Sequence, residues 1–159
     1  MPRIHLTTFI AAPQEVVFDL SRHIGLHKIS QQDHKEEAIN GVTSGLIKEG
    51  DFVTWRAHHL YKTRFLKIRI TKMDRPSFFE DEMEKGDFVS FRHEHHFKPA
   101  QNGTIVIDIL DFESPYGLAG KIMNRLYLTG YLKNLLQQRN KVIKDYAESN
   151  KWKALLTER

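Results

Sequence analysis

The sequence feature that most constrains the fold is a change of hydrophobic period at Pro115. Between residues 51 and 113, apolar and polar residues alternate with the period of two that is typical of β-strands. From Pro115 onward, apolar residues recur every three or four positions over about thirty residues, which predicts a helix roughly 45 Å long. A helix of this length with a wide apolar face needs a large concave partner. The sheet formed by the preceding strands is the candidate that this chain offers.

Two neighbouring stripes make up the apolar face of this predicted helix. The first stripe contains Leu118, Ile122, Leu126, Leu132, Leu136, Ile143 and Ala147. The second stripe contains Met123, Tyr127, Tyr131, Leu135, Val142 and Tyr146. Together the stripes predict a helix that packs against the sheet along its whole length.

The rest of the chain predicts an antiparallel sheet that is covered on one face only. A strand at residues 4–10 is followed by two short helices at residues 14–20 and 24–29, the first of which begins after Pro13. Further strands are predicted at residues 36–40, 51–61, 64–73, 77–83, 88–98 and 104–113. Repeated hairpins with one polar face are typical of a sheet packed on one side. The predicted fold class is therefore α+β.

The composition is that of a globular protein, since 40% of the 159 residues are hydrophobic and 28% are charged. The length predicts a single domain, which we place at residues 1–148, followed by a short tail at residues 149–159. The absence of cysteine excludes disulfides, thiolate zinc sites and a cysteine nucleophile. The first residues do not resemble a signal peptide and no apolar run is long enough to span a bilayer, so we expect a cytoplasmic protein.

The formal net charge of +4 is concentrated towards the C-terminus, where nine bases and three acids follow residue 120. On a helix, most of these bases would lie on the face opposite the apolar stripes, which favours a solvated surface. Weak attraction to acidic lipids or to nucleic acid is the alternative. No strand interleaves aromatic and basic residues in the manner of RNA-recognition domains, so we expect no nucleic-acid partner.

A polar group of residues is predicted on the otherwise apolar inner face of the sheet. The sequence Glu84-Lys85-Gly86 suits a three-residue hairpin with its glycine in the left-handed conformation. That turn pairs Asp81 with Val89 and directs the odd-numbered residues of both strands inward. The predicted inner face is Phe79, Asp81, Met83, Val89, Phe91, His93, His95 and Phe97.

Three kinds of chemistry are open to Asp81, His93 and His95. The two histidines share one face of a strand and could hold a metal ion, with Asp81 or His59 as a further ligand. No third ligand lies at a diagnostic spacing, so we expect neither a metal nor a cofactor. An Asp81–His93 pair could instead act as an acid–base group, since histidine titrates near neutrality. The interpretation that we favour is that these side chains line a pocket and orient the polar end of a ligand.

Several motifs resemble those of a known superfamily. Residues 81–83 (DEM), 86–88 (GDF) and 91–97 (FRHEHHF) resemble the centre of bacterial proteins of the START/SRPBCC superfamily. Residues 12–18 (APQEVVF) resemble the entry into the first helix of that superfamily. The resemblance covers nearly the whole chain and implies the helix-grip fold, in which a curved antiparallel sheet wraps around a long C-terminal helix. The superfamily includes lipid-transfer START domains, birch-pollen-allergen-like proteins and polyketide cyclases.

This resemblance implies that a small hydrophobic ligand, such as a lipid, an isoprenoid or an aromatic polyketide, binds between sheet and helix. The side chains expected to line the site are Trp55, His59, Phe79, Asp81, Met83, Phe91, His93, His95, Tyr127 and Tyr131. The first alternative is a cyclase or dehydratase that uses His93 or His95 with Asp81 as acid–base groups. The second is a regulatory module that binds proteins through the basic helix face or the tail around Trp152. The sequence indicates no oligomeric state.

Overall fold

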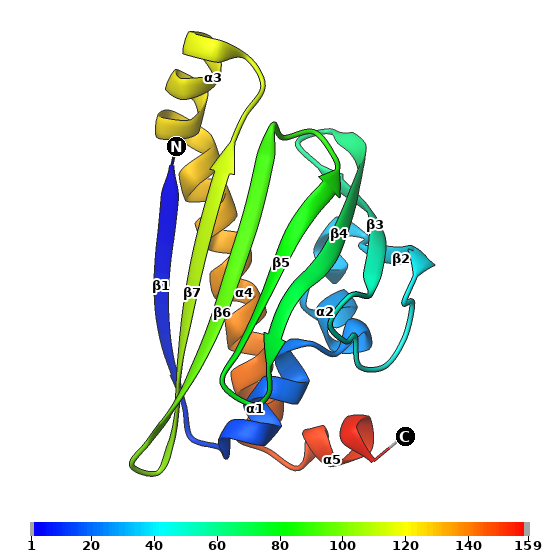
Figure 1. Cartoon of the computed structure of the whole chain (residues 1–159), viewed down its shortest axis with the longest axis vertical. Coiled ribbons are helices and arrows are strands. Elements are labelled where there is room, and N and C mark those ends of the chain that lie inside the picture. The colour runs from blue at the N-terminus through cyan, green and yellow to red at the C-terminus, as the bar shows by residue number, and fades with distance from the viewer. Residues whose placement is uncertain (1, 158–159) are drawn as a thin grey trace.

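The computed structural model describes residues 2–157, apart from the side chains of residues 123–125. Within this part of the chain, seven antiparallel strands form one curved sheet in the order β1-β7-β6-β5-β4-β3-β2 (Figure 1). The strands are β1 (Arg3–Ile10), β2 (Glu37–Gly41), β3 (Phe52–His59), β4 (Lys62–Asp74), β5 (Phe78–Lys85), β6 (Ser90–Ala100) and β7 (Gly103–Glu113). Every predicted strand is present, and no strand end differs from its predicted position by more than two residues.

Helices cover one face of this sheet, and Figure 1 shows the long C-terminal helix crossing behind the strands. The helical segments are α1 (Gln14–Ser21), α2 (Ile24–Ser30), the 3₁₀ turn η1 (Gln32–His34), α3 (Gly117–Met123), the π-helical segment η2 (Asn124–Leu128), α4 (Thr129–Ala147) and α5 (Lys151–Leu156). Both α1 and α2 pack against α4. In the described part of the chain, no helix is both long enough and apolar enough to cross a membrane.

The C-terminal helix changes its surroundings at η2. Before this π-helical segment, α3 extends past the ends of the strands (Figure 1). Leu128 is buried at the end of this turn, whereas Leu118, Ile122 and Leu126 before it are exposed. The prediction that the first stripe packs along its whole length is therefore wrong for its first three members. The side chain of Met123, from the second stripe, lies outside the described residues.

The β5–β6 hairpin has a different register from the predicted one. Asp81 pairs with His93 instead of Val89, a shift of four residues along β6, and Val89 is exposed. The connecting loop is longer than three residues, and Gly86 does not adopt the left-handed conformation. The predicted turn and register are therefore wrong. Because side chains alternate with a period of two, an even shift still leaves Asp81, His93 and His95 on the inner face.

The hydrophobic core lies between the sheet and the helices. Its centre is Phe18 of α1, whose ring meets the rings of Phe79 and Phe97 edge-on, with centroids 5.5 and 5.2 Å apart. A smaller cluster contains Phe112 of β7 and Leu136 of α4. The tail helix α5 packs Trp152, Leu155 and Leu156 against the first cluster. These edge-on contacts hold α1 against β5 and β6 and so close the end of the sheet–helix interface at which α1 lies.

Candidate functional site

A cavity of about 540 Å³ lies between the sheet and the C-terminal helix. Its walls are mainly apolar side chains from β3, β4, β7 and the helix, among them Val53, Ile68, Ile70, Leu110, Leu128 and Leu136. Ligand pockets in proteins commonly have volumes of roughly 300–1,000 Å³ and predominantly apolar walls with a few polar groups. The cavity therefore has the size and the lining of a site for a small molecule.

Four titratable side chains meet at one wall of this cavity. Nε2 of His95 lies 2.7 Å from Oδ2 of Asp81. Nε2 of His93 lies 2.9 Å from Oδ1 of Asp108. Nδ1 of His95 is 3.2 Å from the same Asp108 oxygen but lacks the alignment of a hydrogen bond. Asp81, His93 and His95 reach the cavity, whereas Asp108 stands behind them and is fully buried.

The register of three adjacent strands produces these contacts. Asp81 of β5 lies directly opposite His93 of β6 but bonds to His95, two residues further along β6. Asp108 of β7 lies directly opposite His95 but bonds to His93. Diagonal neighbours on one face of an antiparallel sheet are within reach of long side chains. The two pairs therefore cross, and their imidazole ring centroids lie only 3.7 Å apart.

The C-terminal helix contributes two buried polar side chains to the same network. Nδ2 of Asn140 donates to Oδ2 of Asp108 at 2.6 Å and to the hydroxyl of Thr8 at 3.1 Å. The guanidinium of Arg139 donates to the carbonyl of Ser21 and to Oδ1 of Asn140, and it lies 3.8 Å from Asp108. Arg139 also lines the cavity. The network therefore ties the helix to the sheet and places a positive charge at the cavity wall.

The protonation states of the network follow from burial and from these contacts. Burial alone would raise the pKa of Asp108, but the imidazoles of His93 and His95 and the charge of Arg139 hold that pKa well below its ordinary value. Burial likewise opposes ionisation of Asp81, yet the hydrogen bond with His95 leaves the Asp81 pKa lowered. Burial and the neighbouring His95 lower the pKa of His93. At neutral pH the carboxylates are ionised and His93 is neutral, so its Nε2–H donates to Asp108 and its Nδ1 is an acceptor.

A second polar group lines another part of the cavity. Nδ1 of His59 lies 2.7 Å from the hydroxyl of Tyr131, and Nε2 of His27 lies 2.7 Å from a carboxylate oxygen of Glu36. Burial and the nearby charge of His34 lower the pKa of His59. The side-chain carbonyl of Gln31 is buried and has no hydrogen-bond partner, although its amide donates to the carbonyl of Leu135. Gln31 therefore offers an unused acceptor to a ligand.

Comparison with known proteins identifies the fold but no closer relationship. No family model matches the sequence, and no curated protein matches it. A START superfamily protein from Mycobacterium smegmatis superposes with a TM-score of 0.69 at 13% sequence identity, covering 92% of this chain and 97% of that one. Major latex-like protein 151 from Panax ginseng superposes with a TM-score of 0.70 at 16% identity, covering 93% and 98%. A protein from Thermus thermophilus gives 0.75 at 17% identity, covering 92% and 97%.

The chain has the START/SRPBCC helix-grip fold. This confirms the predicted α+β architecture, with a curved antiparallel sheet around a long C-terminal helix and two short helices after the first strand. At such low sequence identities, structural similarity to these proteins establishes only the fold.

The helix-grip cavity brings together most of the residues that were predicted to form a site. Its lining includes Trp55, His59, Phe79, Asp81, Phe91, His93, His95 and Tyr131. Met83 and Tyr127 lie outside that lining. Tyr127 precedes the end of the π-helical segment, stacks on Tyr131 at a centroid distance of 6.1 Å and is more than half exposed. The predicted Asp81–His93 pair does not form, because Asp81 is hydrogen-bonded to His95 and His93 is hydrogen-bonded to Asp108.

Three members of the network, Asp108, Arg139 and Asn140, were not identified from the sequence. Each of them nevertheless has a recognisable signal in the sequence. Asp108 interrupts an alternation of buried residues along β7, between Val106 and Leu110. Arg139 and Asn140 occupy the buried face of α4, three and four residues after Leu136. A charged or amide side chain at a position that periodicity assigns to the core requires a buried partner. Arg139 is also a base that departs from the predicted solvated helix surface, since it is buried.

The network also has the composition of a metal site. One ligand atom from each of Asp81, His93 and His95 lies within 4.8 Å of the others. In the structure the Nε2 atoms of both histidines are hydrogen-bonded to carboxylates. A metal ion bound through these Nε2 atoms would have to replace their hydrogen bonds to the carboxylates, because a coordinating imidazole nitrogen must be deprotonated.

Proposed function

We propose that the cavity binds a small, largely hydrophobic ligand for transport or sensing, and that the wall of Asp81, His93, His95 and Arg139 orients its polar end. The observation that carries this proposal is an apolar cavity of about 540 Å³ with a hydrogen-bonded polar network at one wall. A lipid, an isoprenoid or an aromatic polyketide fits this description.

The cavity volume limits the size of the ligand. A dry apolar cavity of about 150 Å³ holds one benzene molecule. The present cavity has more than three times that volume, so it suits a molecule of a few fused rings or a short acyl chain with a polar group. Each square ångström of apolar surface removed from water contributes about 25 cal/mol, so the apolar walls would supply most of the affinity. The polar wall would set the orientation of the ligand in the cavity.

The polar wall can accept and donate hydrogen bonds. The ionised carboxylate of Asp81 accepts, and the guanidinium of Arg139 donates, so both are suited to a hydroxyl, a carbonyl or a carboxyl group of a ligand. Across the cavity lining, Gln31 adds a buried carbonyl oxygen without a partner. A ligand that carries a hydrogen-bond donor near Gln31 would satisfy this oxygen, whose burial without a partner is costly.

The two tryptophans allow a direct test, because Trp55 lines the cavity and Trp152 lies outside its lining. The variant Trp152→Phe leaves Trp55 as the single reporter, and Trp55→Phe leaves Trp152. We expect the fluorescent amphipathic probe anilinonaphthalene sulfonate to quench the tryptophan emission of Trp152→Phe in a saturable manner and to leave that of Trp55→Phe nearly unchanged. Equal quenching of the two variants would place the probe on the surface and contradict the proposal.

A second candidate function is acid–base catalysis, and the Asp108–His93 pair is the observation that favours it. A buried carboxylate holds a neutral imidazole that reaches the cavity, which is how proteins fix the tautomer of a histidine base. Substitution of His93 by alanine separates the two functions. A carrier is expected to lose about 1–2 kcal/mol of binding free energy. An enzyme of the cyclase or dehydratase type is expected to lose at least about a hundredfold in rate while its substrate affinity changes less.

A further inference from the structure

We propose that the open end of the cavity docks on an anionic lipid bilayer. The first observation is a collection of exposed apolar side chains at one end of the molecule. Tyr61 is 99% exposed in the β3–β4 turn, and Leu118, Ile122 and Leu126 of α3 and η2 are 79%, 61% and 78% exposed. Figure 1 shows α3 extending past the strand ends on the side where β5 joins β6 and β3 joins β4.

This collection is not the ordinary scatter of apolar residues over a protein surface. The exposed large apolar side chains at this end are Tyr61, Phe65, Val89, Tyr116, Leu118, Ile122, Leu126 and Tyr127. Among the described residues, those elsewhere are only Phe9, Ile29 and Ile39. Single exposed apolar residues need no explanation, whereas a large contiguous group marks an interaction site or a membrane contact.

The second observation is that the cavity opens at the same end. Most residues of its lining are buried or half-buried. The exposed ones are Lys62, Phe65, Asp87, Pro115 and Tyr116, and all lie in the β3–β4 hairpin, the β5–β6 loop or the segment before α3. The aromatic core around Phe18 closes the opposite end. If a surface covers this opening, a ligand can therefore pass between that surface and the cavity without entering water.

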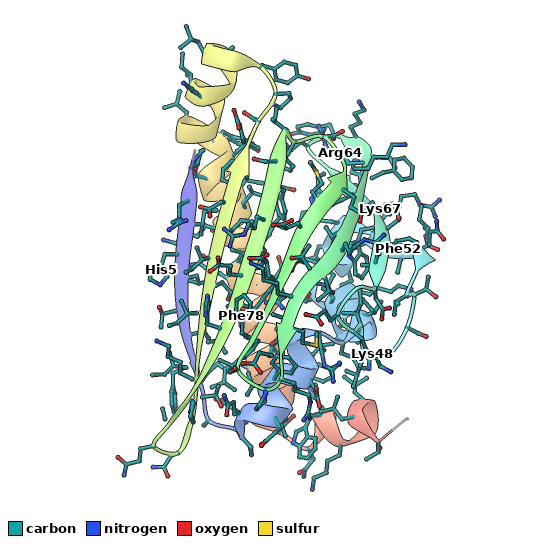
Figure 2. The ribbon with its side chains drawn as sticks, viewed as in Figure 1. His5, Lys48, Phe52, Arg64, Lys67 and Phe78 are labelled. Atoms are coloured by element: carbon teal, nitrogen blue, oxygen red, sulfur yellow. The ribbon has the colours of Figure 1, made fainter. Side chains whose placement is uncertain are left out.

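The third observation is the charge of this end. No Asp or Glu occurs between Glu113 and Asp145, and α3 and η2 at this end contain the bases Lys121 and Arg125. Lys62 and Lys121 are exposed and have no ion-pair partner among the described residues. Asp87 is paired with Arg64 at 2.7 Å, and Figure 2 shows Arg64 at this end. Glu84, beside the same loop, is paired with Lys67 and Arg69. The lysines Lys62 and Lys121 therefore present positive charge beside the apolar side chains.

These features fit a bilayer better than a second copy of the chain. The apolar side chains come from three separate segments around an opening, whereas a dimer interface needs two surfaces that complement each other. Two copies would also bring the lysines Lys62 and Lys121 of both chains together, and like charges repel. Anionic phospholipids complement the bases, while tyrosines and aliphatic side chains insert at the headgroup level. The geometry thus combines the two attractions that hold peripheral proteins on membranes.

The test is sedimentation of the protein with phosphatidylcholine vesicles that do or do not contain phosphatidylglycerol. We expect binding to the anionic vesicles that weakens with added salt. The paired substitution Leu118→Ser and Ile122→Ser is expected to weaken binding by about tenfold per side chain, since each would lose its burial in the bilayer. The control Ile39→Ser removes an exposed isoleucine on β2, away from the opening, and is expected to bind as the wild type does.

Charge variants test the electrostatic part without removing apolar surface. Lys121→Glu, beside the opening, is expected to weaken binding to anionic vesicles several-fold more than Lys141→Glu, which alters an exposed lysine further along the C-terminal helix. Equal binding of all variants, or no binding of the wild type to anionic vesicles, would overturn the proposal. So would a dimer in size-exclusion chromatography that the Leu118→Ser and Ile122→Ser substitutions convert to monomer, because a second copy would then cover the surface. None of these measurements involves the cavity ligand. A negative result would therefore contradict membrane docking and would not contradict the proposed ligand binding.

Discussion

At the residue scale, Asp108 organises the buried network. It is fully buried, bonds to His93 and Asn140, and lies within 4 Å of His95 and Arg139. A buried carboxylate is tolerated only where positive charge and hydrogen-bond donors compensate for lost hydration. The network supplies both, and it connects β6, β7 and α4 through one side chain.

Replacement of Asp108 by alanine is therefore expected to destabilise the protein strongly. Breaking a buried charged network by removing one partner typically costs about 3–5 kcal/mol, because the remaining groups stay buried without partners. Asp111→Ala is the control on the same strand, since Asp111 pairs with the exposed Arg3 and exposed ion pairs contribute little. Urea denaturation measures both free energies of unfolding. Similar losses for the two variants would contradict the account of the network.

The lowered pKa of His93 predicts a dependence of stability on pH. Because the folded-state pKa lies below the ordinary value of 6.5, the unfolded chain binds a proton first as the pH falls. The contribution of His93 to the free energy of unfolding is therefore complete when the pH is above the unfolded-state pKa. This contribution is lost as the pH falls below that value. We expect the free energy of unfolding to decrease between about pH 7.5 and pH 5.5.

Comparison of two variants tests whether His93 causes this pH dependence of stability. His93→Gln is expected to reduce the slope of unfolding free energy against pH, whereas His5→Gln, which alters an exposed histidine on β1 (Figure 2), is expected to leave it unchanged. Urea denaturation at several pH values gives the slopes. A steeper or unaltered slope in His93→Gln would show that His93 does not carry the effect.

At the element scale, the C-terminal helix has two parts with different surroundings. After η2 its apolar residues face the sheet and the cavity, and before η2 they face solvent at the cavity opening. The change occurs where the helix extends past the ends of the strands (Figure 1). One helix thereby serves as a cavity wall along α4 and as an exposed apolar surface along α3.

Two glycine substitutions test how tightly these elements pack. A side chain at Gly130 of α4 would meet nothing within 4 Å, so Gly130→Ala is expected to stabilise the protein by about 1 kcal/mol through its higher helix propensity. A Cβ at Gly103 would lie 2.4 Å from the carbonyl oxygen of Ile10, so Gly103→Ala is expected to destabilise by about 1–3 kcal/mol. Thermal unfolding should shift in opposite directions, and shifts of the same sign would contradict the packing described here.

Periodicity predicted the elements well because it is a local property of the chain. The alternation in β4 and β7 and the change at Pro115 each lie within a few neighbouring residues. The β5–β6 register depended instead on the conformation of the loop around Gly86, which the sequence did not reveal. The Asp81–His95 and Asp108–His93 pairs depended in turn on that register and on β7. How far the helix extends past the strand ends depends on packing between distant segments, and for that reason the exposure of Leu118 was not foreseen.

At the scale of the whole molecule, the helix-grip fold has a closed end and an open end. Aromatic packing around Phe18 fills the closed end, and the cavity lies beyond it, with its exposed lining residues at the other end. The polar network sits on the cavity wall formed by the middle strands of the sheet. This arrangement suits a ligand that enters with its polar group first and leaves its apolar body among the aliphatic walls.

The most direct test of this account is native mass spectrometry of the purified protein, followed by extraction and identification of any retained molecule. Ala57 is buried in the cavity lining, so Ala57→Trp would fill the cavity and serves as the matched variant. We expect one small, largely hydrophobic molecule per wild-type chain and none on Ala57→Trp. A wild-type chain that carries no molecule and takes up no apolar probe, or a molecule retained equally by Ala57→Trp, would contradict it.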